Sequence, residues 1–323
     1  MSRMRTLYPR VGVFGAAFIA AIAAAVPAVP LIGAQQQAPP PRAENPNRVL
    51  AGAIDIHVHN LPDDRPRSID AVDVAILART RGMRGLVLKN HFESTAGIAY
   101  LVRKLVPGIE VFGGIDLNRT VGGINPAAVE HMVKVTGGFG RVVWMPTFDS
   151  ENQVRTSKEQ RPFVSVSRGG VLLPEVKQVI ALIAKHDLIM ATGHSSAAEG
   201  LLLLDEARRQ GVQRLVVTHA MNPPISMTVE QMKQAAALGA RIEFVGSTMR
   251  EAGADARVAR FAEAIRAVGP ANCILSSDLG QAGNPLPPDG FGEFLVALQA
   301  KGFTDAEMQT MARDNPARLL GLR

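Results

Sequence analysis

The chain has 323 residues, of which 47% are hydrophobic and 20% are charged, and its formal net charge is +6. This composition excludes a disordered protein, and the single cysteine excludes a scaffold held together by disulfides. Three of the positive charges, Arg3, Arg5 and Arg10, lie in the first ten residues, and the remaining surplus of +3 is too small to indicate a nucleic acid or an anionic membrane as partner.

The N-terminal segment has the features of a secretory signal. The three arginines are followed by an apolar run at 11–29, and Ala34 offers a small residue for cleavage. Pro27 and Pro30 interrupt the run, whereas a membrane span needs about 20 apolar residues, so a cleaved signal peptide at 1–34 is favoured over an uncleaved anchor. We therefore expect a periplasmic or secreted protein without stable membrane association after cleavage.

Residues 35–48 are rich in Pro and Gln and predict an extended linker. From residue 49 to 323 one continuous pattern follows, which predicts a single domain. Cys273 lies in an apolar run with no group nearby to activate it, so we expect a small buried side chain rather than a nucleophile.

Short runs rich in β-branched residues alternate with longer amphipathic segments in this domain. Eight runs predict strands, at 53–59, 85–91, 111–118, 141–149, 188–194, 214–219, 241–246 and 273–278. Helical patterns occupy 68–82, 125–138, 174–186, 197–210, 228–238, 255–268 and 290–301, with Ser68 and Asn125 as candidate N-caps and Pro126 in a first helical position.

Regular alternation of strand and helix implies parallel strands joined by crossover helices. Eight such units predict a single (β/α)8 barrel, for which roughly 250 residues is typical. A doubly wound open sheet is the alternative, but the segment after the first strand, NLPDDRPR, lacks the glycine-rich turn that such sheets usually have.

Three connections are expected to shape a pocket at the mouth of the barrel and to select the substrate. They are 60–70, 280–290 and the long connection 150–173, in which a hairpin is predicted to turn at Arg168–Gly170.

Polar side chains gather where the predicted strands end, and in a barrel these ends converge on one mouth. The residues concerned are five of the seven histidines and one aspartate: His57, His59, His91, His194, His219 and Asp278. The other two histidines, His131 and His186, lie in helical patterns and are expected at the surface or at a helix cap.

Alternation along the first strand predicts where its histidines point. Side chains two residues apart share a face, so Asp55 lies on the face of His57 and His59, and Ile54, Ile56 and Val58 lie on the other. If the apolar set faces the helices, both imidazoles face the barrel axis, where they could supply two of the neutral nitrogen ligands that zinc needs. A strand that carries histidine for structural reasons is the alternative for this pair taken alone.

The whole set resembles the amidohydrolase superfamily of metal-dependent hydrolases. The match consists of His57-Val58-His59 after the first strand, His194 after the fifth, His219 after the sixth and Asp278 after the eighth. The ending at 314–322, DNPARLLGL, looks like the closing helix of that superfamily, and GLVLKNH, VGGINP, VVWMPT and ATGHSS are similar to an uncharacterised amidohydrolase-like family of bacterial TIM-barrel proteins. The resemblance implies a divalent metal, above all zinc, with metal ligands drawn from His57, His59, His194, His219 and Asp278.

The fourth strand departs from the superfamily pattern, because RVVWMPTFD lacks the Lys or Glu with which many members bridge two metals. In the favoured reading, His219 orients the water or polarises the substrate beside one ion, which is held by His57, His59, His194 and Asp278. In the other reading, a carboxylated Lys89 replaces the missing bridge between two ions. Lys89 and His91 share a face at a strand end and are candidate catalytic residues, although Lys89 could instead be a charged residue of the rim or a protonated group that binds a carboxylate.

The resemblance implies hydrolysis of a small amide, ester or lactone by a metal-activated water, with Asp278 moving the proton. Four further polar residues at the mouth, Asp116, Asn118, Asp149 and Glu243, are candidates for substrate contact or for support of the imidazoles.

A metal-dependent decarboxylase of the same superfamily is the alternative, with Lys89 or Arg65 holding the departing carboxylate. A non-catalytic exported binding protein is the third hypothesis. The expected partner is a small molecule, and a homo-oligomer is left open.

Overall fold

The computed structural model describes residues 48–250 and 253–323. The predicted signal peptide at 1–34 and the predicted linker, except for Arg48, lie outside these residues. Within the described part of the chain, no helix combines the length and apolar character needed to cross a membrane.

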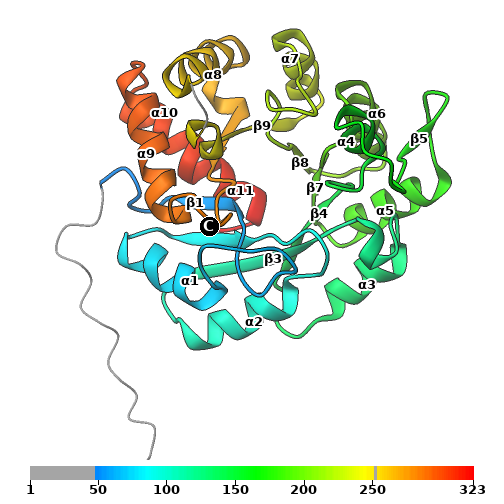
Figure 1. Cartoon of the computed structure of the whole chain (residues 1–323), viewed down its shortest axis with the longest axis horizontal. Helices are drawn as coiled ribbons and strands as arrows, with labels where there is room; N and C mark the ends of the chain where they lie inside the picture. The colour runs from blue at the N-terminus through cyan, green and yellow to red at the C-terminus, as the bar shows by residue number, and fades with distance from the viewer. Residues whose placement is uncertain (1–47, 251–252) are drawn as a thin grey trace, which may run out of the picture. The chain divides into compact units, whose positions relative to one another are not determined.

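Eight parallel strands form one sheet that curves into a nearly closed barrel surrounded by helices (Figure 1). The strands are β1 (Ile54–Val58), β2 (Gly85–Leu88), β3 (Glu110–Asp116), β4 (Gly140–Trp144), β7 (Ile189–Ala191), β8 (Arg214–Val217), β9 (Ala240–Val245) and β10 (Cys273–Ser276), in this spatial order. The first and last strands meet through hydrogen bonds from Asp278 N to His57 O and from His59 N to Leu279 O. The predicted (β/α)8 fold and all eight predicted strands are confirmed.

Helices follow the strands and cover the outside of the barrel (Figure 1). The longer ones are α1 (Ala71–Thr80), α2 (Ala96–Leu105), α3 (Pro126–Lys134), α5 (Pro174–Lys185), α6 (Ala197–Arg209), α7 (Val229–Ala237), α8 (Ala254–Val268) and α9 (Pro287–Ala300). Seven of them match predicted helices, and α2 was not predicted. The Asn125 cap with Pro126 behind it is confirmed, whereas the cap of α1 is Asp70 rather than Ser68, because the Asp70 carboxylate accepts from Val72 N and Asp73 N.

The long connection after β4 has its own structure. It begins with the unpredicted helix α4 (Glu151–Thr156), which is capped by Ser150. It continues into the predicted hairpin, formed by β5 (Ser167–Arg168) and β6 (Val171–Leu172), with Gly169 and Gly170 at positive φ in the turn. The remaining short elements are η1 (Arg119–Val121), η2 (Gly246–Arg250), η3 (Pro270–Asn272), α10 (Asp305–Gln309), the π-helical turn η4 (Thr310–Asp314) and α11 (Asn315–Leu320).

Apolar side chains form two cores, one between the strands and the helices and one inside the barrel. The inner core takes alternate residues from the strands, namely Ile54, Ile56, Val87, Phe112, Val142, Trp144, Ile189, Ala191, Val216 and Ile274. Ala317, Leu319 and Leu320 of α11 complete it, so this closing helix fills the end of the barrel opposite the carboxyl ends of the strands. The barrel is therefore open at one end, where the predicted site residues gather.

The first strand contains a bulge that the sequence did not reveal. Between Asp55 and Val58 lie two residues, but between their partners Leu86 and Leu88 lies one, so the pairing with β2 slips by a residue. Ile54 and Ile56 consequently belong to the inner core and only Val58 to the outer one. The prediction that Ile54, Ile56 and Val58 share one face is wrong, because the bulge reverses the alternation before His57.

Candidate metal centre

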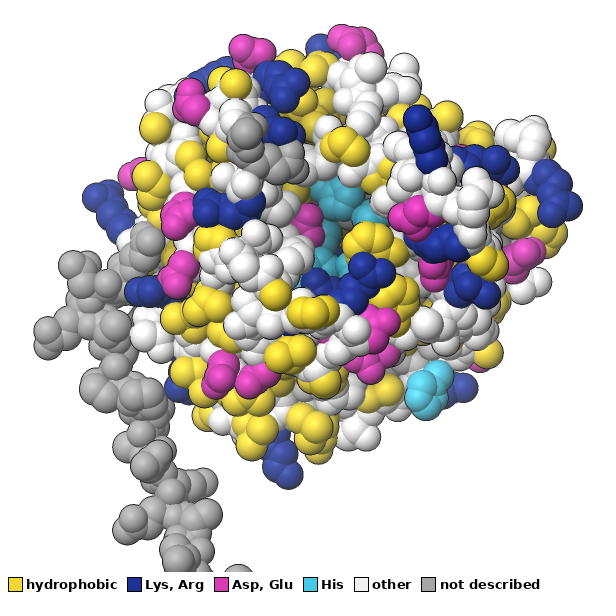
Figure 2. All heavy atoms as spheres, in the orientation of Figure 1, with side chains coloured by type: hydrophobic (Ala, Val, Ile, Leu, Met, Phe, Trp, Pro, Cys, Tyr) yellow, Lys and Arg dark blue, Asp and Glu magenta, His cyan; other side chains and the backbone are white. Residues whose placement is uncertain are grey.

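A cavity of about 550 Å³ lies at the open end of the barrel, a size suited to a small-molecule ligand. Figure 2 shows histidine side chains inside a hollow of this face, with basic side chains beside it. The cavity is lined by His57, His59, Arg65, Pro66, Arg67, Lys89, His91, Phe148, Gln153, His194, His219, Asn222, Pro223, Asp278, Gln281 and Ala282. It thus contains all seven residues predicted as metal ligands or catalytic groups.

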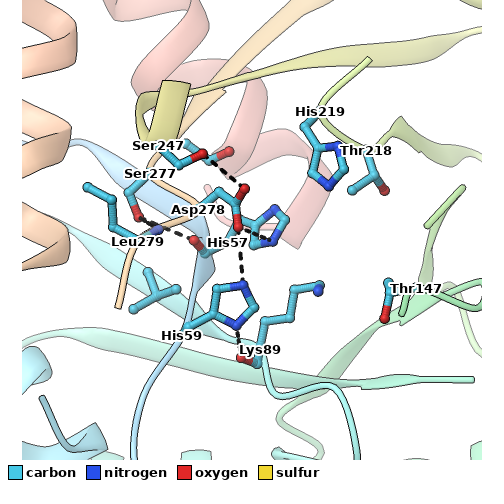
Figure 3. Close-up of polar contacts among 12 residues, drawn as sticks. His57, His59, Lys89, Thr147, Thr218, His219, Ser247, Ser277, Asp278 and Leu279 are labelled. Carbon is cyan, nitrogen blue, oxygen red and sulfur yellow. Dashed lines mark hydrogen bonds and ion pairs between the residues drawn. The ribbon is translucent and has the colours of Figure 1, made fainter. Parts of the chain in front are cut away.

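Three of these residues offer ligand atoms that lie within 4.8 Å of one another, His57, His59 and Asp278. Each imidazole Nε2 is 3.1 Å from the same oxygen, Asp278 Oδ1 (Figure 3). Two ligands held about 2.0–2.1 Å from one tetrahedral zinc ion are about 3.3 Å apart, so the spacing of these donors fits such an ion. The bulge in β1 and the turn after β10 bring the three side chains together.

Three histidines have their Nδ1 atoms fixed by an acceptor, which turns Nε2 toward the cavity. Metal-ligating histidines are usually held in this way, because the second hydrogen bond sets the tautomer and the ring orientation. The bonds run from His57 to Glu243 Oε1 (3.1 Å), from His59 to the Lys89 carbonyl oxygen (2.9 Å) and from His194 to Gln153 Oε1 (2.9 Å).

His219 differs from these three. Its Nε2 lies 3.2 Å from His194 Nε2, and its buried Nδ1 has no hydrogen-bond partner among the described residues. Its position is fixed through the backbone instead, since His219 N donates to Glu243 Oε2 (2.8 Å). The geometry thus separates His219 from the three oriented histidines.

The charges at the centre fit a cation. Burial disfavours the charged form of His57, but the carboxylates of Asp278 and Glu243 outweigh it and raise its pKa to about 9. Although burial opposes it, the same pairing holds the pKa of Asp278 well below its ordinary value. Two carboxylates around a buried ring therefore attract a positive charge, which a proton or a divalent ion could supply.

The other imidazoles are held neutral, as metal ligation requires. Burial lowers the pKa of His59 to about 3 and also lowers the pKa values of His91, His194 and His219. At neutral pH the metal-free centre therefore carries its ionisable proton on His57.

This single proton predicts how zinc affinity depends on pH. If His57 is a ligand, a zinc ion must displace its proton, so the association constant is expected to rise about tenfold per pH unit from pH 7 and to level off near the pKa of about 9. Competition with a zinc chelator of known affinity measures this slope. A His131→Ala variant, altered on the exposed surface of α3, should keep it. An association constant for zinc that does not change between pH 7 and 9 contradicts the role of His57 as a ligand.

Lys89 reaches the cavity from a fully buried position on the inner side of the barrel. Its Nζ lies 3.0 Å from Asp116 Oδ2 and 5.4 Å from the centre of the Trp144 ring, and Figure 3 shows the amine between His59 and Thr147. A carboxylate partner and an aromatic face both suit an ammonium group, whereas a carboxylated lysine would place a second negative charge beside Asp116.

The remaining candidates divide into supporting and distant groups. Asp116 Oδ2 also accepts from Thr147 Oγ1 (2.9 Å) and lies 3.1 Å from His91 Nδ1, and Asn118 donates to Thr147 and to the His91 carbonyl. Asp149, in contrast, is paired with Arg161 (2.6 Å) and does not line the cavity.

Residues predicted to lie away from the site do so. His131 is exposed on α3 and His186 ends α5, and neither lines the cavity. Cys273 is buried, and burial raises its pKa to about 12, as expected of a side chain that serves packing.

Several contributing residues were not predicted, because they belong to no recognisable motif. Gln153 of α4 orients His194, Ser247 of η2 donates to Asp278 Oδ2 (3.1 Å), and Ser276 donates to Glu243 (2.5 Å). The position of Ser276, at the end of β10 and two residues before Asp278, is the one signal that the sequence offered.

Solved structures with the same fold include several enzymes, at sequence identities that establish the fold alone. An amidohydrolase from Pseudomonas aeruginosa is 12% identical (TM-score 0.60, covering 85% of this chain and 98% of that one). An amidohydrolase from Burkholderia multivorans with bound zinc is 15% identical (TM-score 0.57, 84% and 100%). A 2,6-dihydroxybenzoate decarboxylase in complex with 2,6-dihydroxybenzoate is 13% identical (TM-score 0.53, 84% and 100%). The predicted resemblance to the amidohydrolase superfamily is confirmed in the fold.

A search of curated proteins found no match. One family matches residues 52–243, a span that runs from β1 into β9 and contains every candidate ligand except Asp278. This match covers more than half of the chain, which therefore belongs to DUF6282, a family of unknown function.

Proposed function

We propose that this protein is a metal-dependent hydrolase that acts on a small amide, ester or lactone. One observation carries the proposal: His57, His59 and Asp278 converge at the open end of the barrel, with both imidazoles turned toward Asp278 by acceptors on their other nitrogen. We assign one zinc ion to these three residues and His194. The similar amidohydrolase with bound zinc supports this choice of ion.

When bound, a zinc ion at this position lowers the pKa of a coordinated water toward about 7. Asp278 is placed to take the proton, because its low pKa keeps it ionised and its second oxygen is fixed by Ser247 at 3.1 Å. His219 is neutral, has an unpaired Nδ1 and lines the cavity, so it can polarise the substrate or pass a proton to the leaving group. Lys89 and His91 complete the cavity wall beside them.

The other parts of the proposal concern substrate size and location. The cavity volume suits a small molecule, and one of the similar structures holds such a ligand. We place the enzyme in the periplasm or outside the cell, because the basic and apolar N-terminal segment is typical of a secretory signal.

The proposal is tested by replacing His57 and His59 together with Ala. The variant is expected to lose bound metal and turnover, since two of the four proposed ligands are gone. Metal content by mass spectrometry, activity against a panel of amides, esters and lactones, and circular dichroism provide the readouts. His131→Ala should match the wild type. A double variant that retains a full equivalent of metal would rule out the assigned centre.

A decarboxylase is the second candidate, and the buried Lys89 amine beside the cavity favours it, because an ammonium could hold a departing carboxylate. The similar 2,6-dihydroxybenzoate decarboxylase shows that this fold carries such chemistry. Turnover in ¹⁸O-labelled water distinguishes the two. We expect one labelled oxygen in the product and no carbon dioxide, whereas unlabelled product with carbon dioxide would establish the decarboxylase.

A further inference from the structure

The guanidinium of Arg65 lies over two aromatic rings at the edge of the candidate metal centre. Its central carbon is 4.3 Å from the centre of the Phe148 ring and 5.1 Å from that of Phe92. Arg65 is exposed in the connection after β1, so these cation–π contacts hold it in place without burying it. A guanidinium on an aromatic face keeps the N–H donors at its edge available for a planar oxyanion.

Arg65 also differs from the other cations that line the cavity, because it forms no close ion pair within the described residues and meets carboxylates only at longer range, those of Asp64 and Glu159. The Arg67 side chain is buried and paired with Asp63 (2.6 Å), and Lys89 is paired with Asp116 (3.0 Å). No carboxylate lies within ion-pair distance of Arg65 in the described part of the chain. Its charge is therefore available to a ligand.

Phe148 connects Arg65 with the metal centre. The same ring that supports the guanidinium packs edge-on against His91, with the ring centres 4.2 Å apart, and lies 5.6 Å from His194. Asp278 is the one acidic residue among the described residues that line the cavity, and it is engaged by His57 and His59. A ligand in this cavity consequently meets, at one side, a guanidinium that is not held in a close ion pair.

We propose that Arg65 binds an oxyanion of the substrate, a carboxylate or a phosphate, while the reacting group of the same molecule lies at the metal centre. This inference names the substrate class of the proposed hydrolase and rests on that function for turnover, although not for binding. The substrate is then a small anion, of a size that the 550 Å³ cavity accepts. Arg65 is the residue that selects it over neutral analogues.

Binding is tested with three probes of similar size: benzoate, phenyl phosphate and neutral benzamide. Isothermal titration calorimetry at low ionic strength compares the wild type with Arg65→Gln, with and without zinc. We expect Arg65→Gln to weaken at least one of the anions about tenfold or more and to leave benzamide unchanged. The difference should shrink at high salt, because the site is exposed.

Arg266→Gln is the matched control. Arg266 lies 4.4 Å from the centre of the Phe303 ring, a similar stacking contact, but it does not line the cavity. The Arg266→Gln variant should bind both anions with the affinity of the wild type. Loss of affinity for benzoate or for phenyl phosphate alone identifies the preferred oxyanion and supports the inference.

Two results overturn the inference: equal anion affinities of Arg65→Gln and the wild type, or no binding of either anion by the wild type. Failure of the proposed function has a different signature. In that case the wild type lacks zinc and turnover, while the effect of Arg65 on anion affinity in the zinc-free protein can still be measured. Circular dichroism shows whether each variant is folded.

Discussion

Replacing Asp278 with Asn is expected to lower kcat/KM by about 10²- to 10⁴-fold, the range typical for loss of a general acid–base group. The amide has the shape of the carboxylate but cannot take up a proton at neutral pH. It can still accept the hydrogen bond from Ser247, so the backbone turn after β10 should persist. Turnover is measured at saturating zinc, so that weaker metal binding is not mistaken for lost chemistry.

Asp149→Asn is the matched control for this substitution. Asp149 is also a carboxylate near a strand end, but it is buried, pairs with Arg161 and does not line the cavity. Its loss is expected to affect stability and to leave kcat/KM within about threefold of the wild type, since it removes no group from the reaction. If the kcat/KM of Asp278→Asn lies within tenfold of the wild-type value, another residue transfers the proton. His219 would then be the next residue to test.

Replacing Lys89 with Met is expected to destabilise the protein by about 3–5 kcal/mol, as is typical when one partner of a buried ion pair is removed. Lys89 and Asp116 are both fully buried, so the remaining carboxylate would have no counter-ion. Burial already raises the pKa of Asp116, and without Lys89 the carboxyl can avoid its charge by binding a proton. A raised carboxyl pKa makes the folded state less stable as pH rises, so the deficit should grow from pH 5 to pH 8.

Urea unfolding of three proteins checks this expectation. The wild type, Lys89→Met and the double variant Lys89→Met/Asp116→Asn are compared at both pH values. The double variant removes both charges and should recover much of the lost stability and lose the pH dependence. Lys89→Met should retain its zinc. Loss of zinc in this variant, with unchanged stability, would instead support the carboxylated bridge between two ions.

The strands and the site residues could be predicted because both depend on short-range patterns. Runs of β-branched residues between polar segments mark the strands, and the parallel arrangement brings their ends together whatever the details of packing. His57, His194 and Asp278 therefore reached one cavity, as predicted. The spacing of the strands in the sequence could not show which residues would touch.

What the sequence could not show depends on tertiary contacts. The bulge in β1 comes from a slipped pairing with β2, and it is held by Asp55, whose carboxylate accepts from His57 N (3.1 Å) and Ser277 N (3.0 Å). Helix α2 was missed because it starts at Ala-Gly and its capping residue Thr95 makes its side-chain hydrogen bonds to β2 and β3 instead. Gln153 orients His194 from a helix within a loop, and no periodicity in the sequence predicts this hydrogen bond.

The closing helix α11 has a consequence for the order of events in turnover. Because its apolar side chains fill one end of the barrel, the described residues leave the cavity open along the barrel axis only at the carboxyl ends of the strands. In the proposed enzyme, substrate and product would both pass through this opening, beside Arg65 and the loop that carries Gln281. A product would have to leave before the next substrate can bind. Substitutions around this opening would therefore affect both substrate entry and product release.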